Sequence, residues 1–198
     1  MSNIRSLKIP HDRIGAIIGK KGKTKEKIEE KCNIKIEIDG ESGEVTVTPN
    51  DRLDIISISK GIDVIDAISK GFAPEKALML LGEDSAYHSI DLKDYSGKSV
   101  NSLDRIKSRL IGEKGKARRT IEELTDTYIS IYGHSVGIIG KLEQIDKTED
   151  AIKKIITGSS HKYVYNFLQE MRRKNKIEKL QLWEKQEGIK TGVIILDE

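Results

Sequence analysis

The chain has 198 residues, of which 36% are hydrophobic and 34% are charged, so it can fold around a core and is unlike a disordered chain. No apolar run approaches the roughly 18 to 20 residues of a membrane-spanning helix, and residues 1–5 lack the apolar core of an export signal. A single cysteine, Cys32, excludes an internal disulfide and a Cys-rich zinc site. We therefore expect a cytoplasmic protein without membrane contact.

Two basic segments contrast with an otherwise acidic chain. Residues 8–31 hold eight Lys or Arg against four Asp or Glu, and residues 105–119 hold seven against one. The net charge is +3, so with +4 and +6 on these segments the remaining residues carry −7. This distribution is typical of two phosphate-binding surfaces, although solvated helix faces produce similar charge runs.

The first basic segment lies in a predicted β-α-α-β-β-α unit, in which Pro10 ends the first strand. The predicted elements are a strand over 4–9, helices over 12–18 and 23–32, strands over 33–38 and around 45–47, and a helix over 51–70. Pro74 is typical of the first turn of a helix, and we expect a short connecting helix over 75–81.

The second basic segment lies in a unit with the same predicted order. Its elements are a strand over 89–92, an insertion around 95–98, helices over 102–110 and 116–125, strands over 128–132 and 136–139, and a helix over 142–156. Both units carry the motif I-G-x-x-G-K-x-(K/R)-x-x-I-E-E between their first two helices, starting at Ile18 and at Ile111, 93 residues later. This internal repeat favours a functional interpretation of the basic segments.

A β-α-α-β-β-α unit with I-G-x-x-G between its first two helices resembles the type I KH domain. The resemblance implies an α+β fold of tandem type I KH domains, each a three-stranded antiparallel sheet with helices on one face, plus a C-terminal helical extension. We expect the first domain over 1–72, a linker over 73–85, the second domain over 86–158, and a C-terminal helix and tail over 159–198.

The tandem arrangement is also similar to a narrower family. Gly-Lys-Thr-Lys after the first loop, and residues 121–125 before the strand at 128–132, resemble the archaeal relatives of the eukaryotic "partner of Nob" protein. These are assembly factors of the small ribosomal subunit. The resemblance implies binding of single-stranded RNA near the 3′ end of small-subunit rRNA. It also implies two protein partners, the PIN-domain rRNA endonuclease and an initiation factor alpha subunit.

The glycine-bounded loops are the predicted RNA contacts. A GxxG loop clamps about four nucleotides of single-stranded backbone, and glycine permits close approach of the phosphates. Helix N–H groups and cations add attraction at the same place. The predicted RNA-binding residues are Gly19, Lys20, Lys21, Gly22, Lys23, Lys25, Gly112, Glu113, Lys114, Gly115, Lys116, Arg118 and Arg119. Because Glu113 opposes the anion, we expect the first loop to bind more strongly, with partial compensation by Arg118 and Arg119.

We expect the bases to lie in an apolar groove and to be recognised along the neighbouring strand. The predicted groove residues are Ile14, Ile17, Ile18, Ile28 and Ile36. Lys25 and Arg118 occupy positions where common KH domains carry an apolar residue, which suits a phosphate contact. The Glu pairs at 29–30 and 122–123 are interpreted as solvated helix faces.

Other function classes have weaker support. Gly22-Lys23-Thr24 resembles the end of a phosphate-binding P-loop, but that motif requires glycine at position 17, which is Ile17, and a preceding strand. The four histidines are scattered, without metal-ligand spacing. We therefore expect a non-enzymatic monomer without metal or cofactor. A generic KH protein that binds mRNA remains an alternative.

A protein-binding adaptor is the third alternative, and it depends on the C-terminal residues. Tyr163, Phe167, Leu168 and Met171 form an apolar stripe that we expect to pack on the second domain. Residues 172–174 are basic, as expected at a helix C-terminus, and Ile177, Leu180 and Trp183 indicate further helix. Residues 193–196 are an apolar run, either a docking strand or an edge strand.

Overall fold

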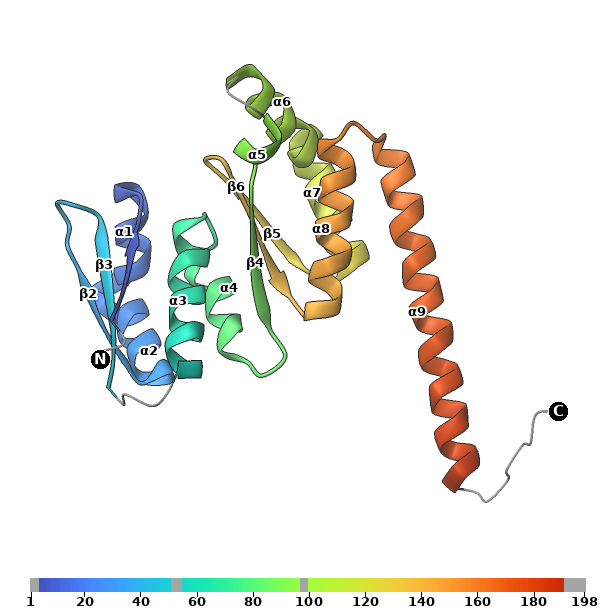
Figure 1. The fold of residues 1–198 in the computed structure, drawn as a ribbon, viewed down its shortest axis with the longest axis horizontal. Helices are drawn as coiled ribbons and strands as arrows, with labels where there is room; N and C mark the ends of the chain where they lie inside the picture. Colours follow the sequence, from blue (N-terminus) through green and yellow to red (C-terminus); the bar gives the residue numbers. More distant parts are fainter. Residues whose placement is uncertain (1–3, 51–54, 97–99, 191–198) are drawn as a thin grey trace.

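The computed structural model describes residues 4–50, 55–96 and 100–190, and it contains two units of the same element order (Figure 1). The first unit comprises β1 (Arg5–Lys8), α1 (His11–Ile18), α2 (Lys23–Cys32), β2 (Ile34–Ile38), β3 (Glu44–Pro49) and α3 (Ile55–Ser69). The connection contains α4 (Pro74–Ala77) and a 3-10 turn over Leu78–Leu81. The second unit comprises β4 (Ala86–Asp91), α5 (Lys93–Ser96), α6 (Val100–Ile111), α7 (Lys116–Thr125), β5 (Tyr128–Tyr132), β6 (Ser135–Gly140) and α8 (Leu142–Ile156). The final helix is α9 (His161–Lys190).

The predicted order β-α-α-β-β-α is confirmed in both units. The second unit also has the short helix α5 at the start of its predicted insertion. The predictions for residues 51–54, 97–98 and 193–196 lie outside the described residues.

Both sheets are antiparallel and place the third strand of the unit in the centre. Their orders are β1-β3-β2 and β4-β6-β5. Ile36 of β2 lies opposite Val47, and the equivalent Ile129 of β5 lies opposite Ile138. As a result, β2 and β5 are edge strands, and each has one row of backbone N–H and C=O groups that no neighbouring strand uses.

Alternating residues determine which face of the first sheet is covered. Ile34 and Ile36 are buried against the helices, whereas the alternating Lys35 and Glu37 are exposed and form an ion pair at 2.8 Å. Val45 and Val47 on β3 complete the same buried face. This period-two pattern is that of a sheet with one face on the core and one in water.

The second sheet is covered on both faces. Its own helices pack on one side, and α3 with the following turn packs on the other, as Figure 1 shows. Phe72 lies so close to Gly137 that a Cβ there would come within 2.7 Å of its ring. Ser130 donates to the Lys70 carbonyl at 3.0 Å, and the Lys70 amine donates to Ser89 at 2.9 Å. The division into separate domains remains a prediction, because the core of the first unit includes Ile139 of the second.

Residues of α1 also contact the second sheet. The Arg13 guanidinium donates to the carbonyls of Ile68 and Phe72 at 2.9 and 2.7 Å and lies 5.7 Å from the Tyr132 ring centroid. The Tyr132 hydroxyl donates a hydrogen bond to the carboxylate of Asp12. These contacts fix the helix that leads into the first GxxG loop against β5.

Helix α9 is continuous over His161–Lys190, so the expectation that residues 172–174 form its C-terminus is wrong. Its first half packs on the second unit through Val164 and Leu168, and the His161 ring contacts the Arg109 carbonyl at 2.8 Å. The expected packing of the apolar stripe is confirmed at Phe167 and Leu168, whereas Tyr163 is exposed. The second half extends away from the sheets in Figure 1.

Candidate nucleic-acid interface

The two GxxG loops have the same backbone conformation. Gly19 has φ 72° and ψ −179°, and Gly112 has φ 68° and ψ −179°. This combination lies in a region that only glycine occupies readily. A Cβ would also come within 2.1 Å of the Thr24 hydroxyl at Gly19 and within 2.6 Å of the Ala117 Cβ at Gly112. The first glycine of each loop is therefore required both by its torsion angles and by the close packing of the following helix.

The second glycine of each loop has a different role. Gly22 and Gly115 have φ of 79° and 78°, in the left-handed region. Around Gly115 there is no heavy atom within 4 Å of an added Cβ, and at Gly22 the nearest is the Glu26 carboxylate at 3.6 Å. The backbone there faces open space, which leaves room for a phosphate to approach.

The residues between the glycines present their side chains to solvent. Lys20 and Lys21 of the first loop are exposed, as are Glu113 and Lys114 of the second. Lys21 and Lys114 adopt left-handed φ of 55° and 49°. Lys23 and Lys116, the first residues of α2 and α7, are exposed as well. Each loop thus places cations beside the N-terminus of a ten-residue helix, which attracts anions through its free N–H groups.

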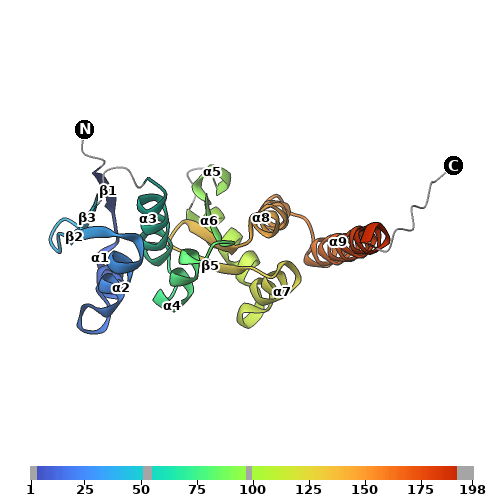
Figure 2. The same ribbon diagram turned by 90° about the horizontal axis from the view of Figure 1, so that it is seen from below.

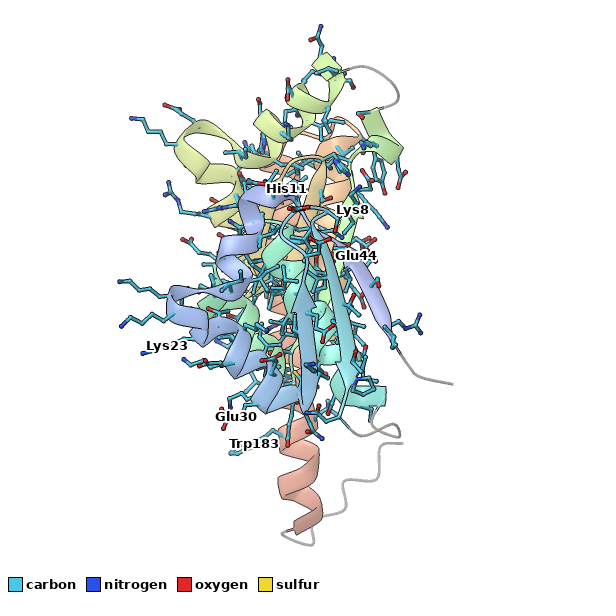
Figure 3. The ribbon with its side chains drawn as sticks, turned by 90° about the vertical axis from the view of Figure 1, so that its left-hand side faces the viewer. Lys8, His11, Lys23, Glu30, Glu44 and Trp183 are labelled. Atoms are coloured by element: carbon cyan, nitrogen blue, oxygen red, sulfur yellow. The ribbon has the colours of Figure 1, made fainter. Side chains whose placement is uncertain are left out.

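Both loops lie on the same side of the molecule. In Figure 2 the α1–α2 loop and the α6–α7 loop both lie along the lower side of the picture, and in Figure 3 both lie to the left, where Lys23 is labelled. The packing of α1 and α3 against the second sheet holds the units in this arrangement. One RNA strand can therefore approach both loops from a single side.

The two loops differ in the charges near them. Glu26 lies beside Gly22 in the first unit, and the equivalent position in the second unit is Arg119. The Arg119 guanidinium donates to the Lys114 carbonyl at 2.9 Å, so it holds the second loop while adding positive charge. Glu113 in the second loop is therefore balanced by Arg119, and Glu26 reduces the advantage expected for the first loop.

Lys25 and Arg118 lie over carboxylates of their own helices. The Lys25 amine is 3.8 Å from Glu29, and Nε of Arg118 is 3.6 Å from Glu122. Glu29 in turn accepts a hydrogen bond from the Ile36 backbone N–H at 2.8 Å. The sequence analysis did not predict this contact between α2 and β2, because it interpreted the Glu pairs as solvated helix faces.

The second unit repeats the bond. Glu122 accepts a hydrogen bond from the Ile129 N–H at 2.7 Å. Both residues lie 93 positions after their counterparts in the first unit, Glu29 and Ile36. For Glu29 and Glu122 the expected solvated face is therefore wrong. The following residues, Glu30 and Glu123, are exposed as expected. The signal in the sequence was the repeated spacing of a cation, a carboxylate four residues later and a β strand.

The predicted groove residues divide into two groups. Ile17, Ile28 and Ile36 are fully buried in the core, so their side chains have no surface to offer a base, contrary to their predicted place in the groove. Ile14 is partly buried, and Ile18 is 37% exposed beside the loop, like Ile111 at 39% in the second unit. The accessible apolar surface thus comes from the isoleucine that precedes each GxxG.

The P-loop alternative does not fit the structure. The loop before Lys23 follows the helix α1, and position 17 is a buried isoleucine. A P-loop needs a strand and glycine there. Within residues 4–50, 55–96 and 100–190, no group of three or more His, Cys, Asp or Glu residues is arranged to hold a metal ion, and no helix is both long and apolar enough to cross a membrane.

Two family models match the chain. The model described as "Eukaryotic type KH-domain (KH-domain type I)" matches residues 86–173, and the model described as "KH domain" matches residues 4–64. Each match includes one of the two GxxG loops.

Individual proteins also match. The chain is 40% identical to the KH domain-containing protein MJ0443 of Methanocaldococcus jannaschii over 94% of its own length and 82% of that protein. It is 33% identical to the pre-rRNA-processing protein PNO1 of Chaetomium thermophilum, over 57% of its own length and 44% of that longer protein. Among solved structures, it matches a chain of the a/eIF2alpha-aDim2p-rRNA complex of Pyrococcus horikoshii with a TM-score of 0.80 and 39% identity, covering 88% of this chain and 96% of that one.

Proposed function

The chain belongs to the family of KH-domain proteins that includes MJ0443, Dim2p and PNO1, and from this we propose that it binds single-stranded RNA of the small ribosomal subunit during rRNA maturation. The RNA backbone lies on the two GxxG loops, and the bases lie towards β2 and β5. The protein contributes binding and not catalysis. We propose the cytoplasm as its place of action.

The duplicated loop geometry carries this proposal. Both loops are exposed, share torsion angles to within a few degrees at their first glycine, and lie on one side of the molecule. Each adds lysines to a helix N-terminus, a combination suited to phosphates. The names of two related proteins support RNA as the ligand, because they refer to pre-rRNA processing and to a complex with rRNA.

The 3′ region of small-subunit rRNA is the proposed target. A direct test measures binding of the purified protein to a single-stranded oligonucleotide of that region, to a scrambled oligonucleotide and to the duplex form. We expect tightest binding to the first and weakest to the duplex, whose paired bases cannot reach the groove. Equal binding to the scrambled strand would favour a generic KH protein, and crosslinked RNA would then come from many transcripts.

Protein partners form a second part of the proposal. The solved complex contains an initiation factor alpha subunit with Dim2p, and we propose the corresponding alpha subunit as a partner here, with the PIN-domain endonuclease as another. The exposed stripe of Ile177, Leu180 and Trp183 on α9 is the surface that favours an adaptor role. Leu180→Glu should weaken capture of the alpha subunit or the endonuclease and leave RNA binding unchanged. A GxxG-loop variant, Lys20→Asp with Lys21→Asp, should weaken RNA binding and leave capture of the protein partner unchanged.

A further inference from the structure

The edge strands β2 and β5 each have a helix carboxylate bound to their free edge. The N–H of Ile36 donates to Oε1 of Glu29 at 2.8 Å, and the N–H of Ile129 donates to Oε1 of Glu122 at 2.7 Å. In an antiparallel ladder a residue's N–H and C=O point to the same side, so the Ile36 and Ile129 carbonyls face this edge too. In both units, the one donor at that point of the edge is already used.

At this point of the edge, beside Ile36 and beside Ile129, the groups of the strand and the carboxylate that remain are hydrogen-bond acceptors. An ionised carboxylate accepts and cannot donate, and its second oxygen is not needed by the strand. The side chains of Glu29 and Glu122 are 25% and 20% exposed, so an incoming group can reach them. Lys25 Nζ lies 3.8 Å from Oε1 of Glu29, and Arg118 Nε lies 3.6 Å from Oε2 of Glu122. At these distances neither cation donates a hydrogen bond to the carboxylate, although each attracts it.

The carboxylate lies where a clamped base would be placed. Glu29 is seven residues beyond Gly22 along α2, which corresponds to about 10 Å of helix. The loop at the start of that helix clamps about four nucleotides, so their bases fall along α2 and the β2 edge. Figure 3 shows α2 running beside the sheet from Lys23 to Glu30.

We infer that Glu29 and Glu122 select guanine at the base position facing each edge strand, an inference that rests on the proposed binding of RNA to the loops. Guanine alone among the four bases presents two neighbouring donors, N1–H and the N2 amino group, on its Watson–Crick edge. A carboxylate accepts both. Adenine and cytosine place an acceptor next to their amino group, and that acceptor would be repelled.

The alternative explanation is that each carboxylate only protects a strand edge. A charged group that covers an edge N–H prevents pairing with other chains. Such a role predicts a loss of stability or solubility when the carboxylate is changed, and no change in base preference. The two roles are therefore separable by one substitution.

The test compares two double variants. The first combines Glu29→Gln and Glu122→Gln, and the control combines Glu30→Gln and Glu123→Gln. The control pair removes the same charge from the next residue of each helix, and both control residues are exposed. Glutamine keeps an oxygen for the strand N–H, and it presents an amide donor outward. The ligands are uridine-rich single-stranded oligonucleotides that differ only in one or two positions, occupied by G, A or C.

We expect the unmodified protein to bind the G oligonucleotide at least tenfold more tightly than the A or C oligonucleotide, as for a good bidentate base contact. The Glu29→Gln and Glu122→Gln protein should lose this preference and shift towards A or C, whereas the control should retain it. A preference that survives the glutamines, or that never exists in a protein that binds RNA, would overturn the inference. Absence of binding to any single strand would instead reject the proposed function.

A second measurement needs no variant. Kethoxal reacts with guanine at N1 and N2, so a guanine held by Glu29 or Glu122 should be protected in the complex with unmodified protein. One protected guanine per engaged loop is the expected result. Full reactivity of every guanine in a saturated complex would contradict the inference.

Discussion

Tyr132 and Asp12 join the two units directly, because the Tyr132 hydroxyl donates a hydrogen bond to the Asp12 carboxylate across the interface. This bond raises the pKa of Tyr132 above its usual value. The Arg13 guanidinium lies over the same ring, 5.7 Å from its centroid. Since Asp12 and Arg13 are on α1, which leads into the first GxxG loop, this contact sets the position of that loop relative to the second.

Tyr132→Ala should loosen this arrangement without affecting either loop. When two sites are held at a fixed spacing, the second contact of one ligand is made at high effective concentration. We expect affinity for an RNA long enough to reach both loops to fall several-fold, and affinity for a short RNA to stay constant. Fluorescence anisotropy with the two lengths measures this, with Tyr163→Ala, an exposed tyrosine of α9, as the control. An equal loss for both lengths would contradict the expected coupling.

Substitution of the two glycines of one loop should have unequal costs. Gly112→Ala places a Cβ within 2.6 Å of Ala117 at a φ and ψ that only glycine adopts readily, so we expect a loss of about 3 kcal/mol in the free energy of unfolding. Gly115→Ala meets no atom within 4 Å, and its left-handed φ should cost only about 1 kcal/mol. Urea denaturation of both variants checks the order. Equal costs would show that the first glycine is not tightly packed.

Asp63 on α3 should make stability depend on pH. Burial, with a contribution from the charge of Asp66, raises the pKa of Asp63 to about 6, well above the usual value for an aspartate. The folded protein therefore binds this proton more tightly than the unfolded chain does. The free energy of unfolding should fall as pH rises from about 4 to 6.

Asp63→Asn removes this dependence. Because the group is only partly buried, we expect a gain of about 1 kcal/mol in the free energy of unfolding at pH 7 and little gain at pH 4. Asp94→Asn, at an exposed residue of α5, is the control. A pH profile of stability that is unchanged by Asp63→Asn would contradict the assignment.

Glu26 beside the first loop should weaken RNA binding. Its carboxylate lies within 3.6 Å of a Cβ built at Gly22, close to where a phosphate would approach. Glu26→Gln should therefore raise affinity for single-stranded RNA about two- to fivefold at low salt, with a smaller effect at high salt because screening reduces the repulsion. Titration at two salt concentrations tests this, and Glu30→Gln should have little effect.

Much of the fold was predictable because its elements have strong periodicity and definite ends. The helices over 23–32, 116–125 and 142–156 and the strand over 128–132 have the predicted bounds. The loops were predictable because the spacing of their glycines is repeated. The long α9 was not, because the basic residues 172–174 resemble a helix end although the helix continues.

The features that sequence reasoning missed depend on contacts between distant residues. The bond from Ile36 to Glu29 exists because α2 packs beside an edge strand, and no local pattern gives that placement. The covered outer face of the second sheet had a signal in β6, where Val136, Ile138 and Ile139 do not alternate with exposed residues. A strand buried throughout its length indicates cover on both faces.

The salt dependence of RNA binding tests the central claim most directly. Each loop is expected to contact about four phosphates, so the unmodified protein should give a slope of log affinity against log salt near −6, and a protein with one loop disabled should give about −3. Lys20→Asp with Lys21→Asp disables the first loop, and Glu113→Asp with Lys114→Asp disables the second; aspartate tolerates the left-handed φ at 21 and 114. With folding intact, either pair should halve the slope and both pairs together should abolish binding. Unchanged affinity and slope in the protein with both pairs would show that the loops do not hold the RNA.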